Sequence, residues 1–204
     1  MTWALIIDGA VAAYPYSEAE LRAAHPGTSF PADLSQTDLS DFGVFTVADA
    51  APPSVTAEQV AEEAPPDLVN GTWQQAWTVR DRTADELAAA KRAALGALAA
   101  LRYEKETAGI TFGGVLIPTD RQTCSILTGA YVQAAGNSAF AIRFKSPDGT
   151  FTPINAAQIL AVGDAVTAHV QACFARESDL ADAINAAQDF AALAAIDTGS
   201  GWPG

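Results

Sequence analysis

The chain has 204 residues, of which 50% are hydrophobic and 17% are charged, so it can bury a core and does not have the composition of a disordered chain. Its formal net charge is −13. A surface this acidic repels nucleic-acid phosphates and anionic lipid surfaces, so we expect neither a nucleic-acid partner nor a membrane partner. The first eight residues lack the basic start and cleavage site of a signal peptide, which predicts synthesis in the cytoplasm.

The N-terminal residues predict a β-hairpin followed by a short helix. Trp3–Ile7 and Ala10–Tyr14 are apolar runs on either side of Asp8-Gly9, a pair that favours a tight turn with positive φ. Ser17 and Glu20 have the three-residue spacing of a capping box, which marks a helix start. We therefore expect the chain to turn back once and then enter a helix.

The next segment changes in composition. Phe42–Val47 is a predicted strand, but residues 48–67 contain two Ala-Pro-Pro sequences and several acids, which predict an irregular, extended stretch. Asn70-Gly71 marks another turn. Thr72–Arg80 alternates enough to predict a strand.

A long alanine-rich helix is predicted over about residues 83–107. Thr83 and Glu86 form a capping box at its start. Small side chains let helices approach closely, so we expect this helix to pack against another helix, in the same chain or in a neighbouring one. The candidate interface consists of one apolar stripe on this helix and two tryptophans of the strand before it: Leu87, Ala94, Leu98, Leu101, Trp73 and Trp77.

The C-terminal part alternates hairpins and helices. The patterns first predict a hairpin at 109–117 and a helix from Asp120 to about Ala135. Strands at 140–145 and 150–154 follow, joined by a type I turn at 146–149. The last two elements are a helix that is capped by Asn155 with Gln158 and passes Arg176, and a helix at 179–196 with a break near Ala187. These elements predict an α+β protein: a small β-rich domain at 1–80 and an α+β domain at 81–204.

The histidines and cysteines do not make a catalytic set. His25 lies in a Pro-Gly loop, where we expect it to be solvated or to cap a turn. His169 and Cys173 share one helix face and could supply two metal ligands, but no third or fourth ligand lies nearby in the sequence, so packing is the favoured interpretation. A disulfide between Cys124 and Cys173 is possible, but two residues do not argue for one, and buried free thiols are the favoured interpretation.

Two acidic pairs and two tryptophans have a functional and a structural interpretation. Glu104 with Glu106, and Glu62 with Glu63, could be paired catalytic carboxylates, but both pairs lie in polar runs where solvation is the default. Trp73 and Trp77 share a strand face and could stack on sugars, although burial against the following helix is favoured. The sequence therefore predicts no enzyme, no cofactor and no metal.

The order of short motifs along the chain resembles that of a group of tail proteins of tailed bacteriophages and prophages. In the first part the resemblance rests on Asp8-Gly9, Ser17–Leu21, His25–Pro31, Pro52-Pro53, Gln59-Val60, Pro65-Pro66, Asn70-Gly71, Trp73 and Trp77–Thr83. The second part resembles an uncharacterised domain that often ends such proteins. It rests on Gly109–Val115, Thr119–Arg121, Thr128–Ala130, Asp148–Thr150, Ile154–Gln158, His169–Cys173 and Gly201–Pro203.

This resemblance implies a virion role without catalytic residues. A long fibre shaft and a receptor-binding region are missing, so the expectation is a small structural subunit of the distal tail, the baseplate or a fibre adaptor, involved in host attachment. Its partners would be other tail proteins and further copies of itself, as a trimer or hexamer. A tail-fibre assembly chaperone and a carbohydrate-binding module of the tail are the alternatives.

Overall fold

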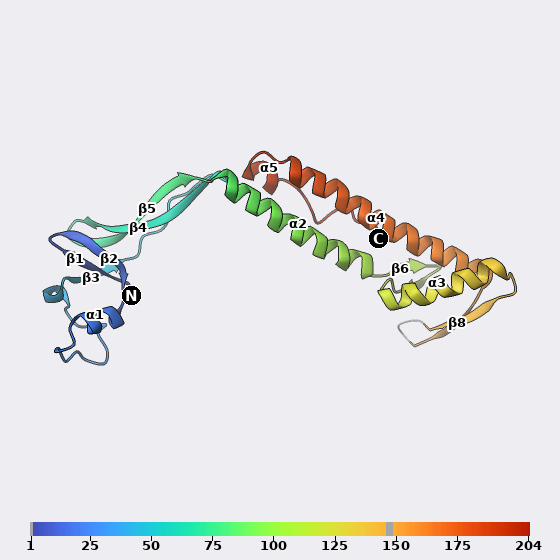
Figure 1. The fold of residues 1–204 in the computed structure, drawn as a ribbon, viewed down its shortest axis with the longest axis horizontal. Helices are drawn as coiled ribbons and strands as arrows, with labels where there is room; N and C mark the ends of the chain where they lie inside the picture. Colours follow the sequence, from blue (N-terminus) through green and yellow to red (C-terminus); the bar gives the residue numbers. More distant parts are fainter. Residues whose placement is uncertain (1, 146–148) are drawn as a thin grey trace. The chain divides into compact units, whose positions relative to one another are not determined.

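The computed structural model describes residues 2–145 and 149–204 and divides the chain into two compact units, Met1–Arg82 and Thr83–Gly204 (Figure 1). The first unit is rich in strands and the second combines helices with two hairpins, so the protein is of the α+β class that the sequence predicts. No helix among the residues described is both long and apolar enough to cross a membrane.

The first unit is built on a five-stranded sheet. Its strands are β1 (Thr2–Ile7), β2 (Ala10–Tyr16), β3 (Val44–Ala48), β4 (Gln59–Val69) and β5 (Thr72–Asp81). They lie in the order β2-β1-β3-β5-β4, and only the β3–β5 pair is parallel. The predicted hairpin is confirmed: Asp8 and Gly9 have φ of 52° and 79°, the paired positive values of a type I′ turn.

A short helix and a loop cover this sheet. Helix α1 (Glu18–Ala24) has the predicted capping box between Ser17 and Glu20. Its buried Leu21 packs with Tyr16, Leu34, Leu39 and Val44. Strand β3 begins two residues later than predicted, because a 3₁₀ turn, η1 (Ser40–Phe42), precedes it and Gly43 takes a left-handed φ of 71°.

The prediction of an irregular stretch over residues 48–67 is wrong in its second half. Residues 59–67 belong to β4, which pairs with β5 along its length. Pro65 and Pro66 fit because β4 is an edge strand and the register shifts between Ala64 and Asp67, so a bulge takes up both residues that lack an N–H. Proline and acidic side chains on an edge strand also hinder pairing with a foreign strand.

The second unit contains two long helices that lie side by side, with smaller elements packed on them (Figure 1). Its helices are α2 (Ala84–Thr107), α3 (Arg121–Gly136), α4 (Ala156–Ala186) and α5 (Phe190–Ala194), and its hairpin strands are β6 (Ile110–Phe112), β7 (Val115–Ile117), β8 (Ala141–Lys145) and β9 (Phe151–Asn155). Capping boxes at Thr83 and Asn155 begin α2 and α4 as predicted. The predicted turn at 146–149 lies outside the described residues except for Gly149.

Helix α4 is longer than the sequence indicates. It continues unbroken through Asp179, where a new helix was predicted, and ends at Ala186. The predicted break near Ala187 is confirmed, and α5 follows it. Leu180 and Ile184 are buried against Leu98 of α2, so their packing holds the last two turns of α4 in helical conformation.

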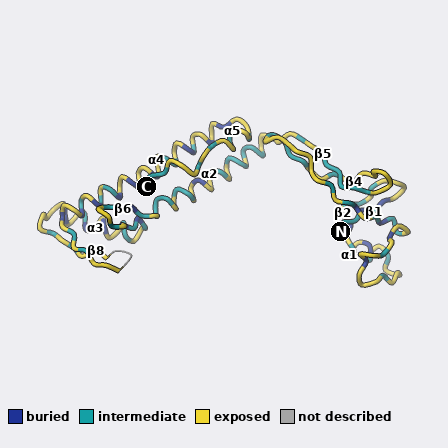
Figure 2. Tube along the Cα trace, turned by 180° about the vertical axis from the view of Figure 1, so that it is seen from behind, coloured by how far each residue is buried: buried dark blue, intermediate teal, exposed yellow. Residues whose placement is uncertain are grey.

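Trp202 packs on this helix pair. Its ring packs on the cluster that Leu98, Leu180 and Ile184 form, and its indole N–H donates to the carbonyl oxygen of Thr198 at 2.9 Å. The opposite end of α4 carries two further clusters, in which α3 and the β6–β7 and β8–β9 hairpins take part. Figure 2 shows that buried positions along α4, and mostly half-buried positions along α2, alternate with exposed ones, since each long helix contributes one face to the core.

Candidate functional site

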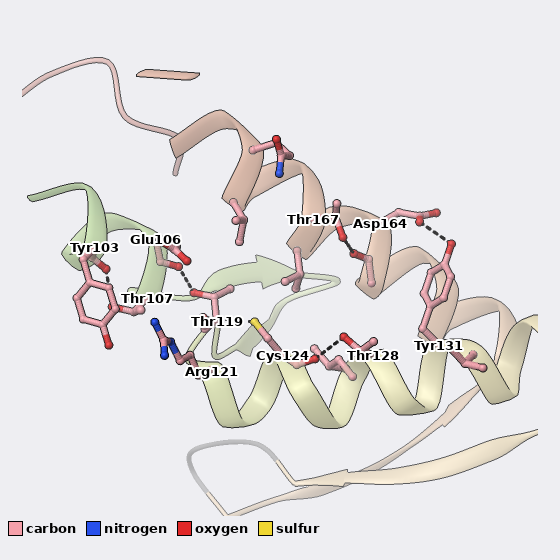
Figure 3. Close-up of a pocket in the computed structure, with 16 residues that line it drawn as sticks. Tyr103, Glu106, Thr107, Thr119, Arg121, Cys124, Thr128, Tyr131, Asp164 and Thr167 are labelled. Atoms are coloured by element: carbon pink, nitrogen blue, oxygen red, sulfur yellow. Dashed lines mark hydrogen bonds between the residues drawn. The ribbon is translucent and has the colours of Figure 1, made fainter. Parts of the chain in front are cut away.

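A groove of about 550 Å³ lies in the helical unit, between the C-terminal end of α2, the helix α3 and the N-terminal half of α4 (Figure 3). Its volume is in the range of ligand-binding pockets. Cys124 and Leu127 of α3 line it together with Val166 and Val170 of α4. These pairs have i,i+3 and i,i+4 spacing, so each helix turns an apolar face toward the groove.

The threonine hydroxyls of the groove are bound to backbone carbonyls. Thr128 donates to Cys124 O, Thr167 donates to Gly163 O and Thr107 donates to Tyr103 O, each at 2.8 Å, and Thr119 donates to Glu106 O. A threonine bound to the carbonyl one turn earlier is part of the helix. None of these hydroxyls is paired with a base, which an activated nucleophile requires.

A side-chain hydrogen bond joins α3 to α4 beside the groove. The Tyr131 hydroxyl of α3 donates to the Asp164 carboxylate of α4 at 2.9 Å, as the dashed line in Figure 3 shows. Because this bond holds the phenol proton beside a negative charge, the pKa of Tyr131 is raised above its usual value of 10.0. At neutral pH the Tyr131 hydroxyl is therefore protonated and donates the hydrogen bond that connects α3 to α4.

Cys124 lies in the groove as a thiol. Its Sγ donates to the carbonyl oxygen of Thr119 at 3.4 Å. Burial raises its pKa, and the negative charge of Asp120 adds to the effect. A raised pKa leaves little thiolate at neutral pH, and thiolate is the nucleophilic form of cysteine. The groove therefore contains no activated sulfur.

The predicted packing of His169 and Cys173 is confirmed. Both side chains are buried, with His169 Nε2 at 3.8 Å from Cys173 Sγ and at 3.2 Å from the carbonyl oxygen of Lys105. Burial raises the pKa of Cys173. Cys173 is a buried free thiol as expected, whereas Cys124 is only half-buried. Within residues 2–145 and 149–204, no three histidine, cysteine or acidic side chains gather as a metal site would require.

His25 is more enclosed than predicted. It ends α1 by donating its backbone N–H to Leu21 O, as a turn cap does, but its ring lies edge-on to Phe42 with centroids 4.9 Å apart. Phe30 lies 5.1 Å from Phe42 and completes the aromatic group. This ring packs with aromatic neighbours and is not fully solvated.

The acidic pairs make structural contacts. Glu62 accepts from Arg80 Nε at 2.8 Å, and Glu63 accepts from Gln75 at 2.8 Å and from the Tyr14 hydroxyl. Glu106 pairs with Arg102, and Glu104 lies 3.9 Å from Lys105 on the exposed side of α2. The members of each pair bind different partners, so neither pair is arranged as an acid and a nucleophile across a shared site.

The prediction that Trp73 and Trp77 pack against the following helix is wrong. Trp73 packs with Ala4, Ile6 and Val47 of the sheet. Trp77 donates its indole N–H to the carbonyl oxygen of Ala50 at 3.0 Å. Both side chains are half-buried in the first unit. Because β5 pairs with β3, Trp73 lies over the sheet and Trp77 lies beside the segment that follows β3.

The candidate stripe on α2 faces α4 of the same chain. Leu98 is 2% exposed and packs on Leu180 and Ile184, and Ala94 joins the same cluster, so their side chains are not available to a neighbouring copy. Leu87 and Leu101 are half-buried. Of the alternatives that the sequence left open, the structure assigns Leu98 and Ala94 to a contact within the chain.

The sequence pattern does not predict the groove. Its apolar residues recur at helical spacing on α3 and α4, which is equally typical of a core face. One further signal was available: residues 122–142 contain no charged side chain in a protein of net charge −13. Depletion of charge is a feature of interface cores.

Residues 86–198 match the family described as Domain of unknown function (DUF4376), which covers more than half of the chain. The protein therefore belongs to this family, and the match includes the whole groove. The comparisons found no curated protein and no solved structure that match the chain.

Proposed function

We propose that this protein is a structural subunit of a bacteriophage tail, located in the distal tail, the baseplate or a fibre adaptor, and that it acts through protein–protein contacts. It would be made in the host cytoplasm and carried in the virion, with other tail proteins and further copies of itself as partners. The motif order described above supports the phage assignment.

The observation that carries the contact role is the apolar surface around the groove. Val132 of α3 is 64% exposed and Tyr103 of α2 is 53% exposed, and both side chains line the groove. Large apolar side chains gathered beside a concave surface are typical of protein interaction sites. The threonine hydroxyls, the Tyr131 hydroxyl and the Cys124 thiol of the groove are bound internally, so its chemistry favours docking over reaction.

The two alternatives make different demands on the protein. A tail-fibre chaperone would use the same apolar surface but would leave before the virion is complete. A carbohydrate-binding module would need aromatic faces open to a sugar. Trp73 and Trp77, the candidates for that role, are each half-buried, with one packed on the sheet and the other bound to Ala50 O. This observation favours a protein partner over a sugar.

Quantitative mass spectrometry of purified virions tests the proposal. We expect this chain at a fixed ratio to the major tail-tube protein in every preparation. Its presence in infected-cell lysate together with its absence from virions would reject the structural role in favour of the chaperone. Immunogold labelling of intact particles would then locate the subunit, and a signal anywhere other than the distal tail would contradict the proposed position.

A further inference from the structure

Helix α3 carries a face that the described residues of the helical unit leave exposed. Gln122, Ser125, Gly129 and Gln133 are exposed on this face, and none of them is charged. Ile126 and Val132 lie one turn before and one turn after Gly129, on either side of it, and are 62% and 64% exposed. The face is therefore a shallow notch at Gly129 between two apolar ridges.

Among the residues that the structure describes, no side chain packs against Gly129. A Cβ at this position would have no neighbouring atom within 4 Å, and the residue has an ordinary helical conformation. Glycine is a poor helix former, so at an open position inside a helix it lowers stability relative to alanine. Close approach of another backbone is one physical reason to keep glycine at such a place.

The charge pattern indicates which partner covers this face. The chain carries a net charge of −13, so most contacts between two copies would bring like charges together. The α3 face avoids this repulsion because residues 122–142 carry no charge. Two-fold contacts place the same patch of both subunits against each other, which suits a surface without charge.

The shape of the face is also complementary to itself. Helices pack by placing the ridge of one into the groove of the other. When two α3 helices cross at Gly129, Ile126 and Val132 of one copy can enter the notch of the other, and the reverse contact follows from symmetry. A partner with a charged or a flat face would fit this surface less well.

We propose that α3 is a self-association surface, and that two copies of this protein pack with their α3 helices crossing at Gly129. The inference rests on the proposed structural role and specifies the homotypic contact through which such a subunit assembles. The groove opens beside Val132, so the second copy also covers the groove edge.

Sedimentation velocity of the 204-residue chain over a range of concentrations tests this contact. Val132→Lys, which places a charge in the contact, should weaken association at least a hundredfold. Ser178→Lys adds the same charge at an exposed position of α4 and should leave it within twofold of the wild type. A wild-type chain that stays monomeric at every concentration, or equal behaviour of the two lysine variants, would overturn the proposal.

Gly129→Ala gives a test in which two effects have opposite signs. In the monomer, alanine should raise the midpoint of thermal unfolding because it favours the helix. In the assembly, the added methyl group should weaken association at least tenfold, because it holds the two backbones apart. A variant that is more stable and associates as well as the wild type would show that Gly129 does not lie at the contact.

Cross-linking identifies the contact directly. Under mild oxidation, Gln133→Cys should give a covalent dimer, whereas Ser178→Cys should not. Capture of another tail protein at this face without self-association would assign the face to a different occupant and reject the proposal.

Virion mass spectrometry is independent of these results. A monomeric chain found in virions refutes the α3 contact alone, and an associating chain absent from virions refutes the tail role alone.

Discussion

The aromatic ring of Tyr131 lies directly against the backbone of Gly163. A Cβ built on Gly163 would be 2.5 Å from Cδ2 of the ring, well inside van der Waals contact. This close approach lets α3 meet α4 at the point where the Tyr131 hydroxyl reaches Asp164. Gly163 is therefore required by packing, in contrast to Gly129 on the neighbouring helix.

Gly163→Ala should destabilise the helical unit. The added methyl group must push the ring aside, and overpacking of this kind costs about 1–3 kcal/mol, against a gain of about 1 kcal/mol in helix propensity. We expect a net loss of about 1 kcal/mol by urea denaturation. Gly96→Ala is the matched control, because a Cβ at Gly96 meets no atom within 4 Å. This substitution should stabilise the protein by about 1 kcal/mol through helix propensity alone. Stabilisation by both substitutions would contradict the packing argument.

Leu98→Ala should reduce stability within a single chain. Leu98 is 2% exposed and packs between α2 and α4, and truncating such a leucine costs about 2–5 kcal/mol. Val132→Ala removes two methyl groups at a position 64% exposed and should change the stability of the dissociated chain by less than about 0.5 kcal/mol. Both measurements belong at concentrations where the chain is monomeric. A loss for Leu98→Ala as small as the one expected for Val132→Ala would mean that Leu98 does not stabilise the monomer.

Local signals predicted the starts of helices well because each start depends on a few adjacent residues. The capping boxes at Ser17, Thr83 and Asn155 are all present in the structure, since the side chain and the amide that it caps lie three residues apart. The same holds for the Asp8-Gly9 turn. Interactions of this range are visible in the sequence.

The predictions of local structure are wrong where residues far apart in the sequence determine the structure through their contacts. Pro65 and Pro66 argue against a strand unless the strand is known to lie at a sheet edge, and only the fold supplies that fact. Asp179 resembles a helix start, but Leu180 and Ile184 pack on α2 and keep α4 continuous. The groove was missed for the same reason, because three helices meet there from separate parts of the chain.

Arg102 joins α2 to α4 through several contacts, and its loss should be costly. It pairs with Glu106 on its own helix, its Nε lies 3.2 Å from Glu177 of α4, and its guanidinium lies 4.5 Å from the centroid of the Phe174 ring. Its side chain is 18% exposed, so Arg102→Leu would leave two carboxylates close together and largely shielded from water. Since these groups keep some contact with solvent, we expect a loss of about 2 kcal/mol, below that of a fully buried pair.

Arg102→Lys separates charge from geometry. A lysine restores one positive charge but cannot form the planar fork of the guanidinium or stack in the same way on Phe174. We expect chemical denaturation to place it between the wild type and Arg102→Leu. A lysine variant as stable as the wild type would show that charge alone accounts for the contribution of Arg102.

Asp120 should make the stability of α3 depend on pH in the acidic range. Its carboxylate caps α3 by accepting from the backbone N–H of Gln122 and Thr123 and from the Thr123 hydroxyl at 2.6 Å. The hydrogen bonds from Thr123, side chain first, lower the pKa of Asp120 below its usual value of 3.8. A lowered pKa in the folded state stabilises the fold above the unfolded pKa, and this contribution disappears as the pH falls through the folded pKa.

Asp120→Ala should therefore lower the thermal midpoint at pH 6–7, and the difference from the wild type should shrink as the pH falls below about 3.8. Asp120→Asn should retain much of the cap at neutral pH, because its amide oxygen still accepts the backbone N–H groups, and should lack the acidic transition. Calorimetric scans are best made well away from the isoelectric point near 4.3, where solubility is lowest. A difference between wild type and Asp120→Ala that stays constant from pH 7 to pH 2 would show that the charge of Asp120 does not contribute to the cap.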